Sequence, residues 1–402
     1  IALVREGDLR GARARAVIAG FGASTDAVHI TAPDRTGGGL ARAGAAALAD
    51  ALLPGEAIDL VSAHATATPF NDAMEARALA TLFAGAPPPV VHPFKAQIGH
   101  TLGAAGVLET LAAASALETG IAPAAAGEGP LDPDAPALLL DRAEPRPLRA
   151  ALKLSAAFGG SNAALVLTRA PSGRPAHALR PVYLRAHAQA DAVDLGELAQ
   201  ATSVARDRLA RLDPLSRLGL SAVAALAAQV TREALVGAGI VAGHALATID
   251  TNEGFDARRR ARGAAAAPPR VFPATSPNAI AGECAIVYRL TGPSFAVSAG
   301  LDGGVEALRA AAELIAAGDA EAMVVLAADD AGPAARALLT EACGEGRALA
   351  RGAVALLLGA QSEGALCEVP LDLVPDHAGA PAGHLSLLRW LGAILSAGAR
   401  AR

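Results

Sequence analysis

The chain has 402 residues, of which 52% are hydrophobic and 18% are charged, and its formal net charge is −5. This composition is typical of a globular protein with enough apolar material for two or three domains. The acidic balance, the 3% aromatic content and the scattered arginines argue against nucleic-acid binding. The apolar runs are shorter than the roughly 18 to 20 residues that span a bilayer, so we expect no membrane insertion and a cytoplasmic location.

Short apolar strands and longer alanine-rich helices alternate along residues 1–170. Strands are expected in IALVRE (1–6), ARAVIAGFGA (14–23) and IDLVSAHAT (58–66), and helices in GGLARAGAAALADALL (38–53) and GVLETLAAASAL (106–117). This alternation predicts a layered α/β fold.

One polar segment follows the third of these strands, LVSAHATATPFNDAMEA (60–76). The strand runs into His64, and Thr66 and Thr68 follow at alternate positions. Alternate residues of an extended segment point the same way, so the two hydroxyls could bind a polar, linear ligand. Taken alone, the segment is better explained as a Thr-rich turn with a buried histidine.

A second segment, HPFKAQIGHTLGAAGVLETLAAASAL (92–117), places Lys95 five residues before His100. His100 directly precedes a helix whose first turn is crowded with glycine and alanine. The positive potential of a helix N-terminus lowers the pKa of a histidine, which keeps the ring neutral and able to bind a developing oxyanion. Tight helix packing would explain the small residues, but not the lysine and both histidines.

The stretch RAPSGRPAHALRP (169–181) interrupts the pattern, and we assign residues 171–181 as a linker. The alternation then returns over residues 182–402, with a long helix expected at 215–239, a strand in SFAVSAG (294–300) and a helix at 303–318. The chain is therefore expected to contain two successive α/β units.

The second unit contains a strand, a tight turn and a helix in GPSFAVSAGLDGGVEALRAA (292–311). Such an elbow presents one side chain at a helix N-terminus, where unpaired N–H groups favour negative charge, and here that residue is Leu301. Leucine is neither a nucleophile nor a ligand. The three cysteines, Cys284, Cys343 and Cys367, form no disulfide framework and no CxxC metal pair, so we expect a reducing compartment and no metal site.

Three motifs of the first unit, AHATATPFND, KAQIGHTLGAAG and SAAFGGSNAALVL, resemble the C-terminal half of the β-ketoacyl-[acyl carrier protein] synthases. The resemblance implies a thiolase-like layered α-β-α fold, with residues 1–170 as a β-ketoacyl synthase C-terminal domain truncated at its start. It implies an acyltransferase that needs no cofactor, because the substrates are carried on the phosphopantetheine of acyl carrier protein.

The resemblance also implies roles for four charged or titratable residues. His64 and His100 would assist decarboxylation of a malonyl unit and stabilise the enolate that results. Lys95 would hold His100 electrostatically, and Glu109 would belong to the buried polar support of that region.

Three further residues receive roles in the same way. Thr66 and Thr68 would contact the phosphopantetheine arm, and Phe158 would gate the acyl site. The sequence departs from the family at Ala65, where glycine is usual, and at 154–157, where Leu-Ser-Ala-Ala replaces a typical Asn-Ser-Phe-Gly. These departures put the flexibility of the gating loop in doubt, but not the histidines.

Residues 182–402 resemble the N-terminal half of the same family, with Leu301 at the position of its nucleophilic cysteine. In the family that cysteine carries the acyl chain as a thioester, which keeps the carbonyl electrophilic. None of the three cysteines of this chain can replace it, and we expect them to be small buried hydrophobes. We therefore expect the cysteine elbow to lie upstream of Ile1 and this chain to be inactive by itself.

Two architectures fit this resemblance. In a circular permutation the two units would form one condensing domain in reversed order. In a tandem fusion a truncated synthase is followed by a short partner that resembles a chain length factor and lacks the nucleophile. We favour the fusion, because residues 1–12 and 352–365 both resemble one family strand, and we expect His384, near the end of the chain, to be structural.

The functional hypothesis is decarboxylative condensation of acyl chains with malonyl-[acyl carrier protein] in fatty-acid or aryl-polyene-type polyketide biosynthesis. Acyl carrier protein and a homodimer or ketosynthase/chain-length-factor pair would be the partners. The alternative is an inactive docking or scaffold module, which Leu301 favours and the retained His64, Lys95 and His100 oppose. A thiolase is a weaker alternative, because SAAFGGSNAALVL lacks the second cysteine that thiolases use as a base.

Overall fold

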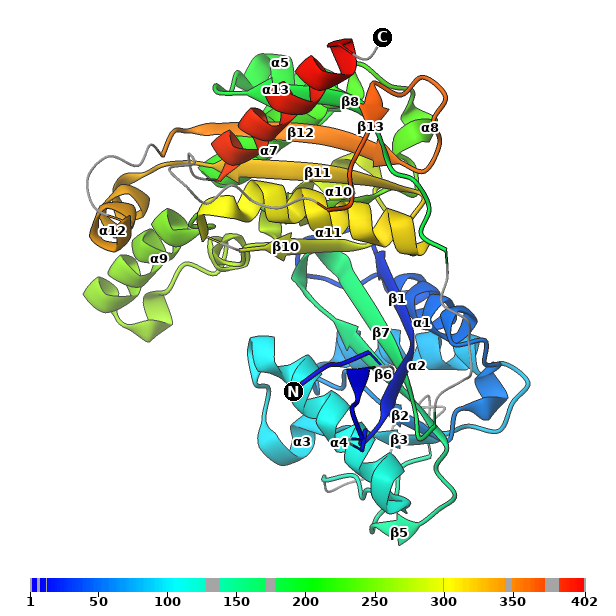
Figure 1. Cartoon of the computed structure of the whole chain (residues 1–402). Helices are drawn as coiled ribbons and strands as arrows, with labels where there is room; N and C mark the ends of the chain where they lie inside the picture. The colour runs from blue at the N-terminus through cyan, green and yellow to red at the C-terminus, as the bar shows by residue number, and fades with distance from the viewer. Residues whose placement is uncertain are drawn as a thin grey trace. The chain divides into compact units, whose positions relative to one another are not determined.

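The structure is a computed structural model that describes residues 2–5, 8–11, 13–127, 138–170, 178–298, 300–343, 349–372 and 383–400 (Figure 1). The chain folds into two compact units, residues 1–26 with 32–176 and residues 27–31 with 177–402. Residues 171–177 of the expected linker lie outside the described residues.

The first unit is built on a five-stranded sheet in the order β1-β7-β6-β2-β3. Its strands are β1 Val17–Thr25, β2 Leu60–Ser62, β3 Val90–His92, β6 Ala150–Ala156 and β7 Ser161–Thr168. The pairs β1/β7 and β7/β6 are antiparallel, whereas β6/β2 and β2/β3 are parallel. A separate two-stranded sheet joins β4 Ile121–Ala122 to β5 Glu144–Pro145.

Helices cover both faces of this sheet. They are α1 Gly38–Asp50, α2 Pro69–Leu82, α3 Lys95–Ile98 and α4 Ala105–Thr119, with short 3-10 turns η2 Gly55–Ala57, η3 Leu102–Ala104 and η4 Phe158–Gly160. One apolar cluster lies beneath α1 and α2, and a second lies beneath α4 on the opposite face. Helix α1 packs very closely on β1, because a Cβ at Gly22 would lie 2.2 Å from the carbonyl oxygen of Ala43.

The prediction of a strand at the start of the chain is wrong for the residues that the structure describes there. Residues 2–5 have no regular secondary structure, and the apolar side chains of Leu3 and Val4 are exposed. A strand needs a neighbour to satisfy its backbone hydrogen bonds, and no described strand pairs with this segment. The argument for a fusion required this strand to be present at both 1–12 and 352–365, and the structure describes it only at the second place, as a strand over Gly352–Gly359.

The second unit contains a six-stranded sheet in the order β10-β9-β11-β12-β8-β13 (Figure 1). Its strands are β8 Tyr183–Ala190, β9 Gly239–Gly243, β10 Ser294–Val297, β11 Ala322–Asp329, β12 Gly352–Gly359 and β13 Cys367–Glu368. Without β13, the strands β8 to β12 have the same order and directions as the five strands of the first unit. In each unit, counted along the chain, the first strand is antiparallel to the last, and the second strand is parallel to the third.

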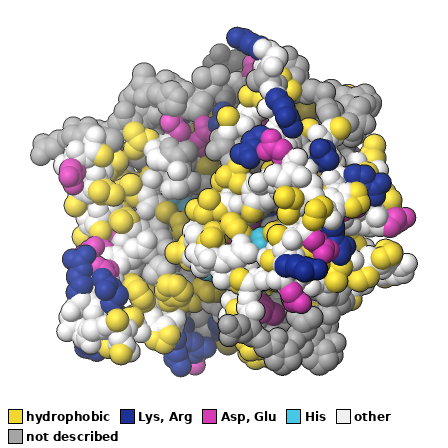
Figure 2. All heavy atoms as spheres, turned by 90° about the horizontal axis from the view of Figure 1, so that it is seen from below, with side chains coloured by type: hydrophobic (Ala, Val, Ile, Leu, Met, Phe, Trp, Pro, Cys, Tyr) yellow, Lys and Arg dark blue, Asp and Glu magenta, His cyan; other side chains and the backbone are white. Residues whose placement is uncertain are grey.

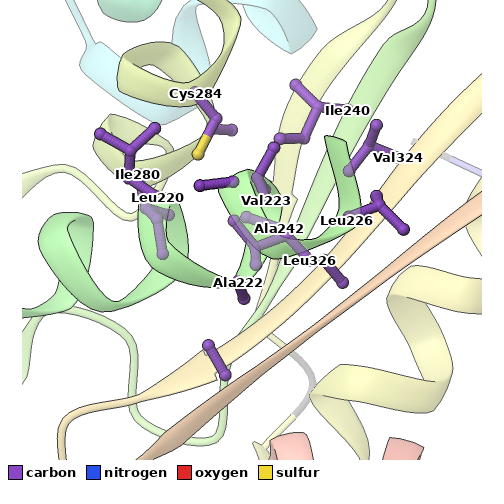
Figure 3. Close-up of a cluster of buried hydrophobic side chains, with 14 of the residues drawn as sticks. Leu220, Ala222, Val223, Leu226, Ile240, Ala242, Ile280, Cys284, Val324 and Leu326 are labelled. Carbon is purple, nitrogen blue, oxygen red and sulfur yellow. The ribbon is translucent and has the colours of Figure 1, made fainter. Parts of the chain in front are cut away.

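The helices of the second unit also form two layers. They are α5 Leu195–Thr202, α6 Arg206–Ala210, α7 Pro214–Ala227, α8 Arg232–Leu235, α9 Ile249–Arg262, α10 Ala279–Tyr288, α11 Gly303–Ala317, α12 Pro333–Cys343 and α13 His384–Arg400, with 3-10 turns η5 Ala264–Ala266, η6 Phe272–Thr275 and η7 Gly300–Asp302. An apolar cluster under α7 and α10 includes Cys284 (Figure 3), and another lies under α11 and α13. The single helix expected at 215–239 is instead divided into α7 and α8.

Candidate active site

The predicted site residues of the first unit gather at the carboxyl ends of two neighbouring parallel strands. His64 follows the end of β2 by two residues, and Lys95 begins α3 shortly after the end of β3. His100 lies in the turn before η3, and Glu109 lies on α4. Carboxyl ends of parallel strands meet at one edge of a sheet, where loops can converge on a ligand.

A buried group of three charges forms the base of the site. Nζ of Lys95 lies 2.5 Å from Oε1 of Glu109, and Nζ of Lys153 lies 2.6 Å from Oε2 of the same carboxylate. All three side chains are at most 5% exposed. Sequence reasoning missed Lys153, which lies on β6, although it is one of only two lysines in the chain.

The backbone at His64 is held by a second buried carboxylate. Oε1 of Glu75 accepts a hydrogen bond from the N–H of His64 at 2.7 Å, and Oε2 accepts one from the N–H of Ala65 at 2.8 Å. Burial raises the pKa of Glu75, although these two hydrogen bonds favour its charged form. Ala65 has φ 41°, a left-handed conformation that glycine adopts more readily, and it stands where the family usually has glycine.

Lys95, which was expected to hold His100, places its positive charge against the ring of His64 in the structure. Nζ of Lys95 lies 3.5 Å from its Nδ1 and also donates a hydrogen bond to its carbonyl oxygen. Burial, followed by the charges of Lys95, Lys153 and His100, lowers the pKa of His64 to about 3. The ring is therefore neutral at physiological pH, and since an ammonium group occupies the Nδ1 side, its proton lies on Nε2.

His100 has the same proton arrangement for a different reason. Its Nδ1 accepts a hydrogen bond from the N–H of Leu102 at 3.1 Å, so the neutral ring carries its proton on Nε2. The rings of His64 and His100 lie edge to face, with centroids 6.0 Å apart and an interplanar angle of 88°. The structure thus brings the two predicted histidines together.

His100 is exposed, and so are large hydrophobic side chains close to it in the sequence, including Leu102 and Val107. Figure 2 shows a face on which a histidine side chain lies among hydrophobic ones.

The two predicted threonines form a pair of their own. The hydroxyl oxygens of Thr66 and Thr68 lie 3.2 Å apart, and the side-chain amide of Asn71 donates a hydrogen bond to Thr68 at 2.7 Å. The segment is not extended as the sequence predicts, because Ala65 and Ala67 have φ values of 41° and 58°. Thr68 is exposed. Phe158 lies in η4 and is partly exposed, beside Gly159 with φ 84°.

The elbow of the second unit has the geometry that the sequence predicts, without a reactive group. Leu301 lies in η7, between β10 and α11, and its carbonyl oxygen accepts a hydrogen bond from the N–H of Gly383 at 2.8 Å. Gly303 begins α11 where a Cβ would lie 2.1 Å from the carbonyl oxygen of His244. The elbow backbone therefore packs tightly, while Leu301 offers no nucleophile.

The remaining predicted residues of the second unit lie in its sheet and helices. Cys284 is buried in α10, and burial raises the pKa of its thiol. Cys367 lies in β13 and Cys343 ends α12. His384 is buried, and its Nδ1 lies 2.9 Å from Oδ2 of Asp329, which fits a structural role.

The part of the chain that the structure describes lacks two kinds of feature. Within it, no group of three or more His, Cys, Asp or Glu side chains could hold a metal ion. None of the described helices has both the length and the apolar character needed to cross a membrane.

The chain matches two family models, the β-ketoacyl synthase C-terminal domain over residues 15–127 and the β-ketoacyl synthase N-terminal domain over residues 175–347. It is 39% identical over 162 residues to a mitochondrial 3-oxoacyl-[acyl-carrier-protein] synthase of Arabidopsis thaliana, a match that takes in 39% of this chain and 35% of the relative. It is 36% identical over 162 residues to 3-oxoacyl-[acyl-carrier-protein] synthase 2 of Coxiella burnetii, taking in 40% of this chain and 39% of the relative. The chain thus spans less than two fifths of the length of these relatives.

Among solved structures, the PfaC keto synthase–chain length factor superposes with a TM-score of 0.73 and 19% sequence identity. The superposition covers 91% of this chain and 51% of the other. At this identity the similarity speaks for the fold, and it confirms the predicted thiolase-like layered α/β arrangement.

Proposed function

Because the chain belongs to the β-ketoacyl synthase family, we propose that its first unit supplies the decarboxylating half of a condensing enzyme that extends acyl chains with malonyl-[acyl carrier protein]. The observation that carries this proposal is the pair of neighbouring histidines. In the neutral form of each ring, His64 and His100 carry the proton on Nε2, for the reasons given above.

The proposed chemistry follows from that proton arrangement. When the malonyl group loses CO2, the electrons of the broken C–C bond pass into an enolate, whose oxygen becomes negatively charged. Two Nε2–H groups aimed at that oxygen would stabilise it without any change of protonation state. The enolate carbon would then attack an acyl thioester, and a cysteine thiolate would leave.

That cysteine is not at the elbow of the second unit, where Leu301 stands. We therefore propose that the second unit is a non-catalytic partner that resembles a chain length factor and shapes the acyl site. The synthase domain would comprise residues 1–170, the linker residues 171–181 and this partner residues 182–402. The fold similarity to PfaC, a keto synthase–chain length factor, supports a fusion of this type.

The same proposal includes the remaining sites and partners. Thr66 and Thr68 would contact the phosphopantetheine of acyl carrier protein, and Phe158 would gate the acyl site. The proposal also includes pairing, either as a homodimer or as a ketosynthase with a chain length factor. It further includes an aryl-polyene-type product, a cytoplasmic location and the absence of a cofactor.

The experiment measures two steps separately, in a protein that joins the chain to the cysteine-bearing half that the proposal requires. His100→Ala and His64→Ala should abolish elongation with labelled malonyl-[acyl carrier protein], while acyl loading stays measurable. Elongation by the His100→Ala variant at the wild-type rate would overturn the roles given to the histidines.

A second candidate function is an inactive docking module, which Leu301 favours. That module would bind acyl carrier protein but release no CO2 from its malonyl form, with or without the histidines. The buried charges beneath His64 argue against it, because an inactive module gains nothing from burying two lysines that apolar residues could replace.

A further inference from the structure

We propose that Lys153 is a positioning residue of this site: it holds Glu109 from the side opposite to Lys95, and so keeps the Lys95 ammonium group on the His64 ring. This inference rests on the proposed function and deepens it, because it explains how the ring keeps its proton on Nε2. None of the motifs that carry the family resemblance assigns a role to Lys153.

The position of Lys153 in the sheet is the first observation. It lies on β6 between Leu152 and Leu154, which are fully buried, and its own side chain is 3% exposed. Its ammonium group contacts Oε2 of Glu109 at 2.6 Å and donates a hydrogen bond to the carbonyl oxygen of Leu154. Burying an ammonium group is unfavourable, so a leucine or methionine would be the more stable choice if packing were its only role.

The second observation is that the two lysines contact different oxygens of the Glu109 carboxylate. Lys153 takes Oε2 of Glu109 and Lys95 takes Oε1. The Lys95 ammonium group also reaches the carbonyl oxygen and Nδ1 of His64. Without Lys153, both oxygens of Glu109 would compete for the Lys95 ammonium group and draw it away from the ring.

The charges around His64 are the third observation. Charged and titratable groups that face it or its partners come from several elements: Lys95 of α3, Lys153 of β6, Glu109 of α4, Glu75 and Asp72 of α2, His100 before η3, and His92 at the end of β3. Glu75 is engaged by backbone N–H groups of residues 64 and 65, so its charge is directed at the backbone. The ring of His64 is left facing the lysines, and Lys153 is the charge that offsets Glu109.

The test reads the His64 ring directly, by 15N NMR of histidine side chains in the chain itself, with the His64 signal assigned by loss in His64→Gln. In the wild type we expect a single neutral Nε2–H form at pH 7. In Lys153→Met we expect the Nδ1–H form to appear and the onset of ring protonation to rise by about one pH unit. Lys153→Gln, which keeps an amide donor but no charge, should behave in the same way and serves if the Met variant does not fold.

The matched control is Arg149→Met. Arg149 precedes β6, is 77% exposed and pairs with Asp59 at 3.5 Å, so the change removes one positive charge close to the start of the same strand. It should leave the His64 signals unchanged.

Three results would overturn the proposal. They are a folded Lys153→Met or Lys153→Gln protein with the wild-type His64 form, a Nδ1–H or protonated ring in the wild type at pH 7, or the same change in Arg149→Met. The NMR measurement needs no turnover, so a failure of the proposed function would appear separately, as no CO2 release by a protein whose His64 ring behaves as expected.

Discussion

Replacing Glu109 by glutamine tests the buried charges most sharply, because the change removes one charge and keeps the shape of the side chain. Glu109 is the shared counterion of Lys95 and Lys153, at 2.5 and 2.6 Å, and all three side chains are at most 5% exposed. The variant leaves two buried ammonium groups without a carboxylate between them. Removing one partner from a buried ion pair lowers the free energy of unfolding by about 3 to 5 kcal/mol.

For a unit of this size, that loss corresponds to a fall in Tm of roughly 6 to 20 °C. The deficit should shrink as the pH rises. Burial lowers the pKa of Lys153 below its ordinary value, so between the folded and unfolded pKa values the unfolded chain binds more protons. In that window stability rises with pH, and the cost of the buried ammonium group is fully present only below the folded pKa.

The assay is urea unfolding of the chain, followed by circular dichroism at pH values from 7 to 10. Glu118→Gln is the matched control, because Glu118 lies on the same helix and pairs with Arg15 at 2.9 Å, where Arg15 is 65% exposed. A surface pair of this kind contributes about 0 to 1 kcal/mol. If Glu109→Gln were no less stable than Glu118→Gln, or if its deficit did not change with pH, the reasoning would be refuted.

Three further predictions concern both units. Because the pKa of His64 is lowered to about 3, CO2 release from malonyl-[acyl carrier protein] should show no fall from His64 protonation between pH 8 and pH 5, and a pH–rate profile checks this. Asp329→Ala removes the acceptor of both the backbone and ring N–H groups of His384, so hydrogen exchange should become faster along α13 while α4 is unaffected. Gly303→Ala should destabilise the second unit by roughly 1 to 3 kcal/mol through overpacking, whereas Gly392→Ala, where an added Cβ meets nothing within 4 Å, should not; thermal melts of the two variants decide.

The sequence predicted the parts of the site that depend on local spacing. His64 follows a recognisable strand, His100 precedes a recognisable helix, and Lys95 lies five residues before His100. Glu109 was expected as buried support, and it is buried. These positions follow from strand and helix periodicity together with the family resemblance.

Two buried residues, Lys153 and Glu75, were missed because their partners come from distant elements. Lys153 meets Glu109 across 44 positions of sequence, and no period of 2 or 3.6 residues signals such a contact. Glu75 looks like one more charge on an alanine-rich helix, although it binds the backbone of residues 64 and 65. Convergence of side chains in three dimensions decides both cases.

The errors in secondary structure have a similar cause. IALVRE has strand composition, but the described residues 2–5 have no strand beside them, and composition alone does not supply a partner. The apolar pattern at 215–239 continues past the end of α7, yet the helix stops at Ala227 and α8 begins again at Arg232, after Thr231. Threonine favours positions just before a helix over positions inside one.

In both units the third strand in chain order leads to a long helix: β3 leads through α3 and η3 to α4, and β10 leads through η7 to α11. In the first unit that connection carries His100 before α4, and in the second it carries Leu301 before α11. The connection from the third strand to this helix therefore carries a polar side chain in one unit and an apolar one in the other. The two units therefore keep one strand topology while they differ in the side chains that this connection carries.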